Sequence, residues 1–143
     1  MLWVTRKQIR VNRTATAWLI RRFVDAHAEF SFVEPSDVER VQRETGAIGF
    51  DAPGARYAND GGVTSFEQIV AAYGIADPAL HEIARIVHAA DIAGQEALAV
   101  EAPGLQLISR GFPLVARDDH ETIEKAAFLY DALYAALRKR ARS

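Results

Sequence analysis

The 143-residue sequence contains no cysteine. This absence excludes disulfide bonds, thiolate nucleophiles and every zinc or iron–sulfur site that depends on cysteine ligands. The sequence also lacks an uninterrupted apolar run of about 18 residues, the length that a membrane-spanning helix needs. Residues 1–7 lack the apolar core of a secretion signal and are typical of a strand. We therefore expect no membrane association and a cytoplasmic location.

An excess of one charge sign is also missing. The chain carries 17 Lys+Arg and 19 Asp+Glu, for a formal net charge of -2. This balance argues against a dedicated nucleic-acid binder, which needs clustered cations to neutralise phosphates. The hydrophobic fraction of 50% and the charged fraction of 25% are typical of an ordinary globular protein. We expect one domain over residues 1–143.

The order of the hydrophobic patterns predicts an α+β fold that is predominantly α, with about five or six helices and a small sheet of short strands. Capping signals mark three helix starts: Thr64 with Glu67, Asp77 before Pro78, and Asp118 with Glu121. The expected strands are 3–5 and 29–33, a hairpin spans 47–57 with its turn at 52–55, and the expected helices are 13–25, 36–43, 64–73, 78–91, 105–115 and one from 118 onward.

Two arginines fall inside the first predicted helix, whose apolar residues cover almost its whole circumference. At least one guanidinium of Arg21 and Arg22 is therefore either desolvated or reaches past its apolar neighbours, and a buried guanidinium needs a partner. One interpretation pairs it with a carboxylate such as Asp25 or Asp51. The other leaves it facing an oxyanion, because the planar guanidinium fork suits bidentate oxygen binding. The loop residues Asn59 and Asp60 are further candidates for ligand contact, although turn formation alone explains them.

Four residues are candidates for a metal site. His88 and Asp91 lie three apart on one predicted helix, and Asp119 and His120 lie at the start of another. Two imidazoles and two carboxylates suit Mn, Fe or Zn. The alternative is that His88 is solvated opposite its helix's apolar face, and that Asp119 is placed by the helix dipole.

These residues, in this order, resemble the chromate-resistance protein ChrB family, specifically its C-terminal domain. The resemblance covers nearly the whole chain, and no single motif in it is a catalytic signature. It implies a bacterial protein that serves the response to chromate, in a family found beside chromate transporters and sometimes joined to rhodanese-like domains. The resemblance is carried by residues 3–6, 18–25, 28–33, 46–51, 65–66, 88–91, 118–120 and 129–134.

The chain departs from the family pattern at two places. Family members typically have Cys-Pro where this chain has Thr16 and Ala17, and His-x-Gly-Glu-x-Cys where this chain has residues 59–64. Both thiols, a histidine and an acid of the family pattern are therefore absent. These departures argue against thiol-based chromate reduction and against a complete family-type metal site.

Three functional hypotheses stay open. The first is a ChrB-like cytoplasmic domain with a small cleft that binds a divalent metal or an oxyanion, using the residues named above. The second is a non-enzymatic module that senses an oxyanion through buried arginines or binds a partner. The third is a hydrolase or lyase with His88 or His120 as general base, so the sequence leaves open whether the chain is an enzyme. A homodimer through Tyr130, Tyr134 and Leu137 is a further expectation, although these residues also suit a core.

Overall fold

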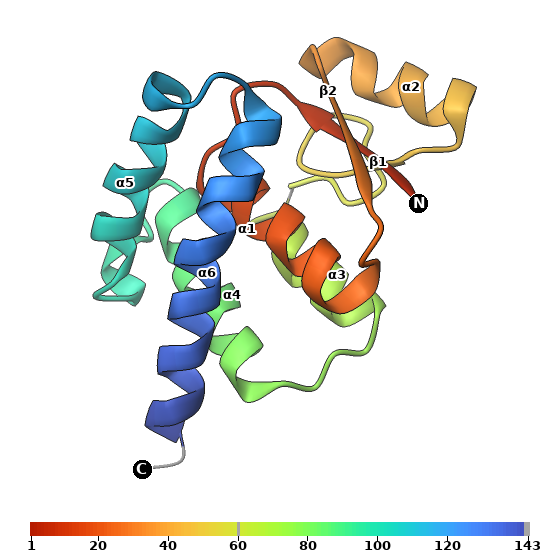
Figure 1. Ribbon diagram of the computed structural model, residues 1–143. Coiled ribbons are helices and arrows are strands. Elements are labelled where there is room, and N and C mark those ends of the chain that lie inside the picture. Colours follow the sequence, from red (N-terminus) through yellow and green to blue (C-terminus); the bar gives the residue numbers. More distant parts are fainter. Residues whose placement is uncertain (60, 142–143) are drawn as a thin grey trace.

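The computed structural model describes residues 1–59 and 61–141. These residues form six α-helices and three short strands, which confirms the predicted α+β class with its helical majority (Figure 1). In chain order the elements are β1 (Leu2–Arg6), α1 (Val11–Leu19), a π-helical turn (Ile20–Val24), β2 (Glu29–Val33), a 3-10 turn (Pro35–Asp37), α2 (Val38–Thr45), β3 (Ile48–Gly49), α3 (Ser65–Ala72), α4 (Pro78–Asp91), a 3-10 turn (Glu96–Leu98), α5 (Ala102–Val115) and α6 (Asp119–Ala141).

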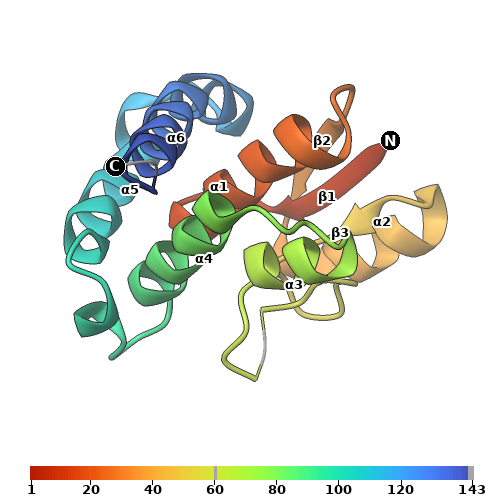
Figure 2. The ribbon, with the colours of Figure 1, turned by 90° about the horizontal axis from the view of Figure 1, so that it is seen from below.

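The three strands form a parallel sheet in the order β2-β1-β3. Parallel neighbours need crossover connections, and α1 and α2 supply them. Trp3 of β1 points into the main core, whereas Val4 packs with Val38 of α2 on the other face. The small sheet is thus covered on both faces, as parallel sheets usually are. Figure 2 shows α2 and α5 at opposite ends of the molecule.

The predicted hairpin over 47–57 is wrong, although its turn is present. Ala55 N donates to Ala52 O at 3.0 Å, and Gly54 has the positive φ of 76° that this turn requires. The first arm pairs with β1 in parallel, and the returning chain makes only a parallel bridge between Phe50 and Tyr57. Pro53 and Gly54 indicated the turn correctly, but long-range pairing with β1 determines the strand.

Helix α1 lies at the centre of the molecule and contacts α3, α4, α5 and α6. Arg13 is its only residue that is not buried, which confirms the burial predicted from the apolar circumference. The expected helix over 13–25 changes at Ile20 into a π-helical turn, where Asp25 N donates to Ile20 O. Arg21 is half-buried and Arg22 is exposed in this turn, so both side chains reach past their apolar neighbours, which is one of the two outcomes expected from the sequence.

The predicted caps form as expected at two helices. Thr64 and Glu67 make a reciprocal capping box at α3, and the Asp77 side chain accepts from Ala79 N at α4. At α6, Asp118 accepts from Glu121 N at 2.8 Å, while the Glu121 side chain reaches back to the N–H of Arg117 rather than of Asp118. No helix of the described residues is long and apolar enough to cross a membrane.

Candidate functional site

A polar cavity of about 340 Å³ opens beyond the carboxyl ends of β1 and β3. The chain leaving β1 runs to β2 on one side, whereas β3 lies on the other side, so this is a point where the strand order reverses. Open parallel sheets commonly bind ligands at such points. Four arginines line the cavity, which we call the arginine cleft: Arg6, Arg10, Arg13 and Arg110.

A buried ion pair forms one wall of the arginine cleft. Arg13 Nη1 lies 3.0 Å from Asp51 Oδ2, and the two side chains are only 12% and 3% exposed. Burial lowers the pKa of Arg13, and the charge of Asp51 offsets part of that change. Two atoms of this pair, Arg13 Nε and Asp51 Oδ1, are buried and have no hydrogen-bond partner among the described residues. The wall therefore retains an unused guanidinium donor.

Asp51 is held rigidly in an unusual backbone conformation. Its φ of 51° lies in the left-handed region, which Asp tolerates better than most residues. Its N–H donates to Tyr57 O at 2.9 Å, and its carbonyl accepts from Arg6 Nε at 2.9 Å. Thr5 Oγ1 donates to the preceding carbonyl of Phe50 at 2.6 Å. These bonds fix the carboxylate against Arg13 and tie β1 to the loop after β3.

A second carboxylate, Asp91 at the end of α4, also lines the arginine cleft. It accepts a hydrogen bond from Asn59 Nδ2 at 2.7 Å. Burial raises the pKa of Asp91, and the nearby negative charge of Asp51 raises it further. Asp91 therefore holds a proton more readily than an ordinary aspartate does.

The remaining arginines lie nearer to solvent. Arg6 is half-buried and its Nη2 lies 3.7 Å from Asp51 Oδ1, whereas Arg10 and Arg110 are exposed. Within residues 1–59 and 61–141, neither the Arg10 nor the Arg110 side chain has a carboxylate or hydrogen-bond partner. Four cations against Asp51 and Asp91 leave a net charge of about +2 in the cleft when both acids are ionised.

The start of α1 adds a second source of positive potential. Val11 and Asn12, in the first turn of this helix, line the arginine cleft. No side chain caps the helix, and its first turn contains no acidic residue. The N–H groups and dipole of a helix start favour an anion. The guanidinium groups and the start of α1 thus both favour a negative charge in the same cavity.

Asp119, predicted as a metal ligand, instead supports the loop that carries Arg10. Its two carboxylate oxygens accept from the backbone N–H groups of Gln8 and Ile9, both at 3.0 Å. Gln8 has a positive φ of 60°, so this loop adopts a strained conformation that the clamp stabilises. The clamp links α6 to the β1–α1 loop and so positions one edge of the arginine cleft.

The structure does not bring the four predicted metal ligands together. His88 lies between α3 and α4, where its Nδ1 is 2.9 Å from Glu67 Oε1. Asp91 lines the arginine cleft. His120 lies in a hollow beside β2, where its ring and the Phe32 ring are T-shaped with centroids 4.9 Å apart. No three His, Asp or Glu side chains of the described residues are placed to hold one metal ion. In this arrangement the four predicted ligands do not form one set of metal donors. The metal site stays a prediction.

The predicted anion contacts are also dispersed. Arg21 stacks over the Phe30 ring at 4.9 Å, and Arg22 pairs with Asp131 at 3.1 Å on the surface. Arg22 thus pairs with a carboxylate, as one interpretation expected, but the partner is Asp131; Asp25 pairs with the N-terminal amine and Asp51 with Arg13. Asn59 donates a hydrogen bond to Asp91, which lines the arginine cleft. Asp60 lies outside the described residues.

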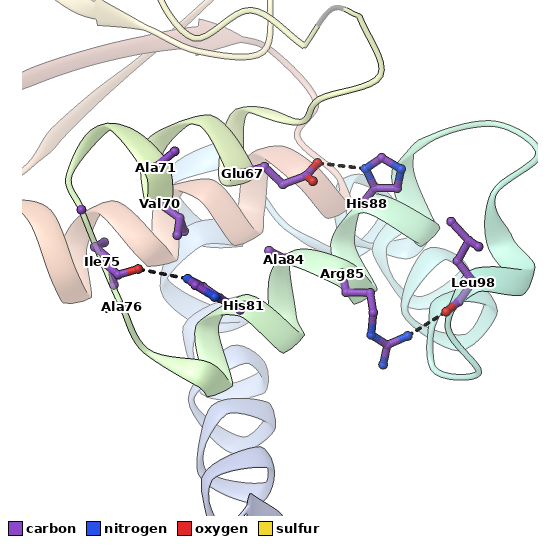
Figure 3. Close-up of a pocket in the computed structure, with 11 residues that line it drawn as sticks. Glu67, Val70, Ala71, Ile75, Ala76, His81, Ala84, Arg85, His88 and Leu98 are labelled. Carbon is purple, nitrogen blue, oxygen red and sulfur yellow. Dashed lines mark hydrogen bonds and ion pairs between the residues drawn. The ribbon is translucent and has the colours of Figure 1, made fainter.

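A second cavity, of about 630 Å³, lies between α3 and α4 (Figure 3). Its walls are mainly apolar, and its polar side chains already bind the chain itself. His81 Nε2 lies 3.1 Å from Ile75 O, Arg85 Nη1 donates to Leu98 O at 2.7 Å, and His88 pairs with Glu67. Because these groups are used internally, this cavity offers an anion less than the arginine cleft does.

The comparison with known proteins decides the family. The family model described as ChrB, C-terminal domain, matches residues 3–137. The chain belongs to this family. The curated Protein ChrB of Cupriavidus metallidurans (strain ATCC 43123 / DSM 2839 / NBRC 102507 / CH34) is 34% identical over 133 residues. That alignment covers 92% of this chain and 39% of the relative, so the chain spans about two fifths of that ChrB protein. No solved structure matches the chain significantly.

The positions where the ChrB pattern has thiols carry hydrogen-bonded hydroxyls in this chain. Thr16 Oγ1 lies 3.0 Å from Ser65 Oγ and 3.2 Å from Asn12 Oδ1 in the core. Thr64 Oγ1 accepts from Glu67 N at 3.1 Å. Both hydroxyls have partners: Thr16 bonds to Asn12, which lines the arginine cleft, whereas Thr64 caps α3 with Glu67, which lines the cavity between α3 and α4.

The sequence reasoning missed most of the arginine cleft. Arg6, Arg10 and Arg13 lie close together in the sequence, but Arg110 lies about a hundred residues later. The sequence signal that could have indicated the cleft was a strand followed within a few residues by arginines and by the start of a helix. Only the parallel pairing of β1 with β3 places Asp51 beside them.

Proposed function

We propose that this ChrB-type domain binds a small oxyanion of the chromate or sulfate class in the arginine cleft. The observation that carries the proposal is the convergence of Arg6, Arg10, Arg13 and Arg110 on one cavity. Guanidinium groups match the geometry of tetrahedral oxyanions and remain charged at physiological pH. A dianion also balances the net charge of about +2 that the cleft carries.

Binding would divide between a buried anchor and an exposed rim. Arg13 is held by Asp51 and contributes its unpartnered Nε without a large loss of side-chain freedom. Among residues 1–59 and 61–141, no carboxylate pairs with Arg10 or Arg110, so these side chains turn to the anion at little electrostatic cost. This division predicts that the rim arginines alter affinity without unfolding the protein.

The resemblance to a chromate-resistance family suggests chromate as the physiological anion, and sulfate has the same charge and shape. The side chains that line the arginine cleft recognise the charge and the shape of the anion. It contains no cysteine to reduce chromate, because the chain has none. We therefore propose binding without turnover, the role of a sensor or carrier module, in preference to a hydrolytic reaction.

Isothermal titration calorimetry at low ionic strength tests this proposal. The purified protein is titrated with sodium sulfate and with sodium chromate, alongside the double variant Arg10→Gln plus Arg110→Gln. The matched control is Arg40→Gln plus Arg43→Gln, which removes two exposed cations from α2. We expect binding that weakens with added salt, a loss of at least tenfold in the cleft variant, and less than threefold in the control.

Two results would contradict the proposal. One is the absence of heat from either anion at millimolar concentration. The other is an equal loss in both double variants, because net charge alone would then explain the binding.

A further inference from the structure

The outward face of α5 is apolar and carries no charge. Leu114 and Val115 are each 83% exposed, and Leu107 and Ile108 are more than half exposed. At 100° per residue these four side chains fall within about a third of the circumference. The opposite side of the helix, with Ala102, Leu105 and Ser109, is buried against the domain. The helix is therefore apolar on a face that no other element of the described chain covers.

Two glycines lie within the same face. A side chain added to Gly104 or Gly111 would meet nothing within 4 Å, and neither residue has a positive φ. Glycine inside a helix is destabilising unless the backbone conformation or a close approach requires it. Neither reason applies within the part of the chain that the structure describes, so both positions leave room for a close approach from outside.

The position of α5 leaves this face accessible. The helix lies at one edge of the molecule in both ribbon views (Figure 1, Figure 2). The residues that the sequence suggested for self-association, Tyr130, Tyr134 and Leu137, are instead buried in the core. Any association through helices must therefore use another face, and the outer side of α5 is apolar enough to serve.

We propose that the outer face of α5 pairs with α5 of a second copy of this chain, antiparallel about a two-fold axis. With the axis near the middle of the helix, Gly104 of one copy faces Val115 of the other. The same register places Gly111 opposite Ile108. Large residues thus meet small ones at both places, and the two-fold repeats each contact.

The available surface is sufficient for a weak, specific dimer. The four exposed side chains together with Val100, which is 92% exposed, present about 500 Å² of apolar surface per copy, and a pair would bury about 1,000 Å². This area is at the lower end of specific interfaces. Helix α5 contains no acidic residue, and its one cation, Arg110, lies beside the apolar face, where the two-fold axis brings the two copies of Arg110 to the same flank of the contact.

Analytical ultracentrifugation of the full chain tests the α5 pairing. The wild type is compared with Gly104→Gln and Gly111→Gln, which place an uncharged, helix-forming side chain where the partner helix approaches. The matched control is Ala72→Gln in α3, an exposed helical site separated from α5 by α4 (Figure 2). Circular dichroism at low concentration verifies that every variant keeps its helical content.

We expect the wild type and Ala72→Gln to approach twice the monomer mass of 15.8 kDa at tens of micromolar. Both glycine variants should remain monomers, with dissociation constants raised at least tenfold and helical content unchanged. A wild type that is monomeric at 200 µM would overturn the proposal. So would glycine variants that dimerise as the wild type does. Anion binding by the arginine cleft is measured separately and does not depend on this outcome.

Discussion

Replacing Asp51 with Asn should change stability and anion affinity in opposite directions. The carboxylate is 3% exposed and lies 3.0 Å from Arg13, so the substitution leaves a buried guanidinium without its counter-charge. Breaking a buried pair by removing one partner costs about 3–5 kcal/mol. Asn keeps a hydrogen-bond acceptor and tolerates the φ of 51°. We therefore expect the free energy of unfolding to fall by about 3 kcal/mol, which lowers the melting temperature by about 6–12 °C.

The same substitution removes a negative charge from the arginine cleft. For a charge about 6 Å from the anion, at an effective dielectric constant of about 20, the repulsion is about 3 kcal/mol per unit of anion charge. After salt screening we expect sulfate to bind at least tenfold more tightly to Asp51→Asn. Because a ligand that binds only the folded state stabilises it, added sulfate should restore part of the lost stability.

Urea denaturation and calorimetric titration measure the two effects. Glu34→Gln is the control, because its ion pair with Lys7 is exposed on both sides and should contribute less than about 1 kcal/mol. Unchanged stability in Asp51→Asn would show that the buried pair is not a structural anchor. Weaker sulfate binding in this variant would refute the electrostatic account of the cleft.

Three further predictions follow from other contacts. Asp91 holds its proton more tightly in the folded state than in the unfolded state, so stability should fall as pH rises from about 4 through the raised pKa; urea denaturation between pH 4 and 8 should show a smaller fall for Asp91→Asn. Thr64→Ala breaks the capping box of α3 and should lower the free energy of unfolding by about 1–2 kcal/mol, whereas no loss would mean that the cap is dispensable. Asp119→Ala frees two backbone N–H groups of the β1–α1 loop and should raise the sulfate dissociation constant several-fold in calorimetry; unchanged affinity would separate the clamp from the cleft.

Local signals predicted the helices well because their causes are local. The capping residues Thr64 and Asp77 begin α3 and α4 as expected, and the apolar circumference of α1 led to a buried central helix. The sheet was harder, because its pairing is long-range. The two residues of β3 carry too short a pattern to show that they pair in parallel with β1.

The candidate site shows the same division between local and long-range causes. The hypothesis of an arginine-based oxyanion site named Arg21 and Arg22, but Arg21 stacks over Phe30 and Arg22 pairs with Asp131, and neither lines the arginine cleft. The cleft that the structure presents depends on Arg110 and Asp51, which reach Arg13 only through tertiary packing. Helical periodicity contains no information about that convergence, and it also placed His88 opposite the apolar face, although His88 is partly buried beside Glu67.

The position of the bound anion tests the central claim most directly. A crystal of the protein soaked in chromate, with diffraction recorded near the chromium absorption edge, locates the metal atom of the oxyanion by its anomalous signal. We predict one strong peak in the arginine cleft, within hydrogen-bond reach of Arg13 and of the first turn of α1. A peak elsewhere, beside Arg21 and Arg22 or between α3 and α4, with none in the cleft, would contradict the account.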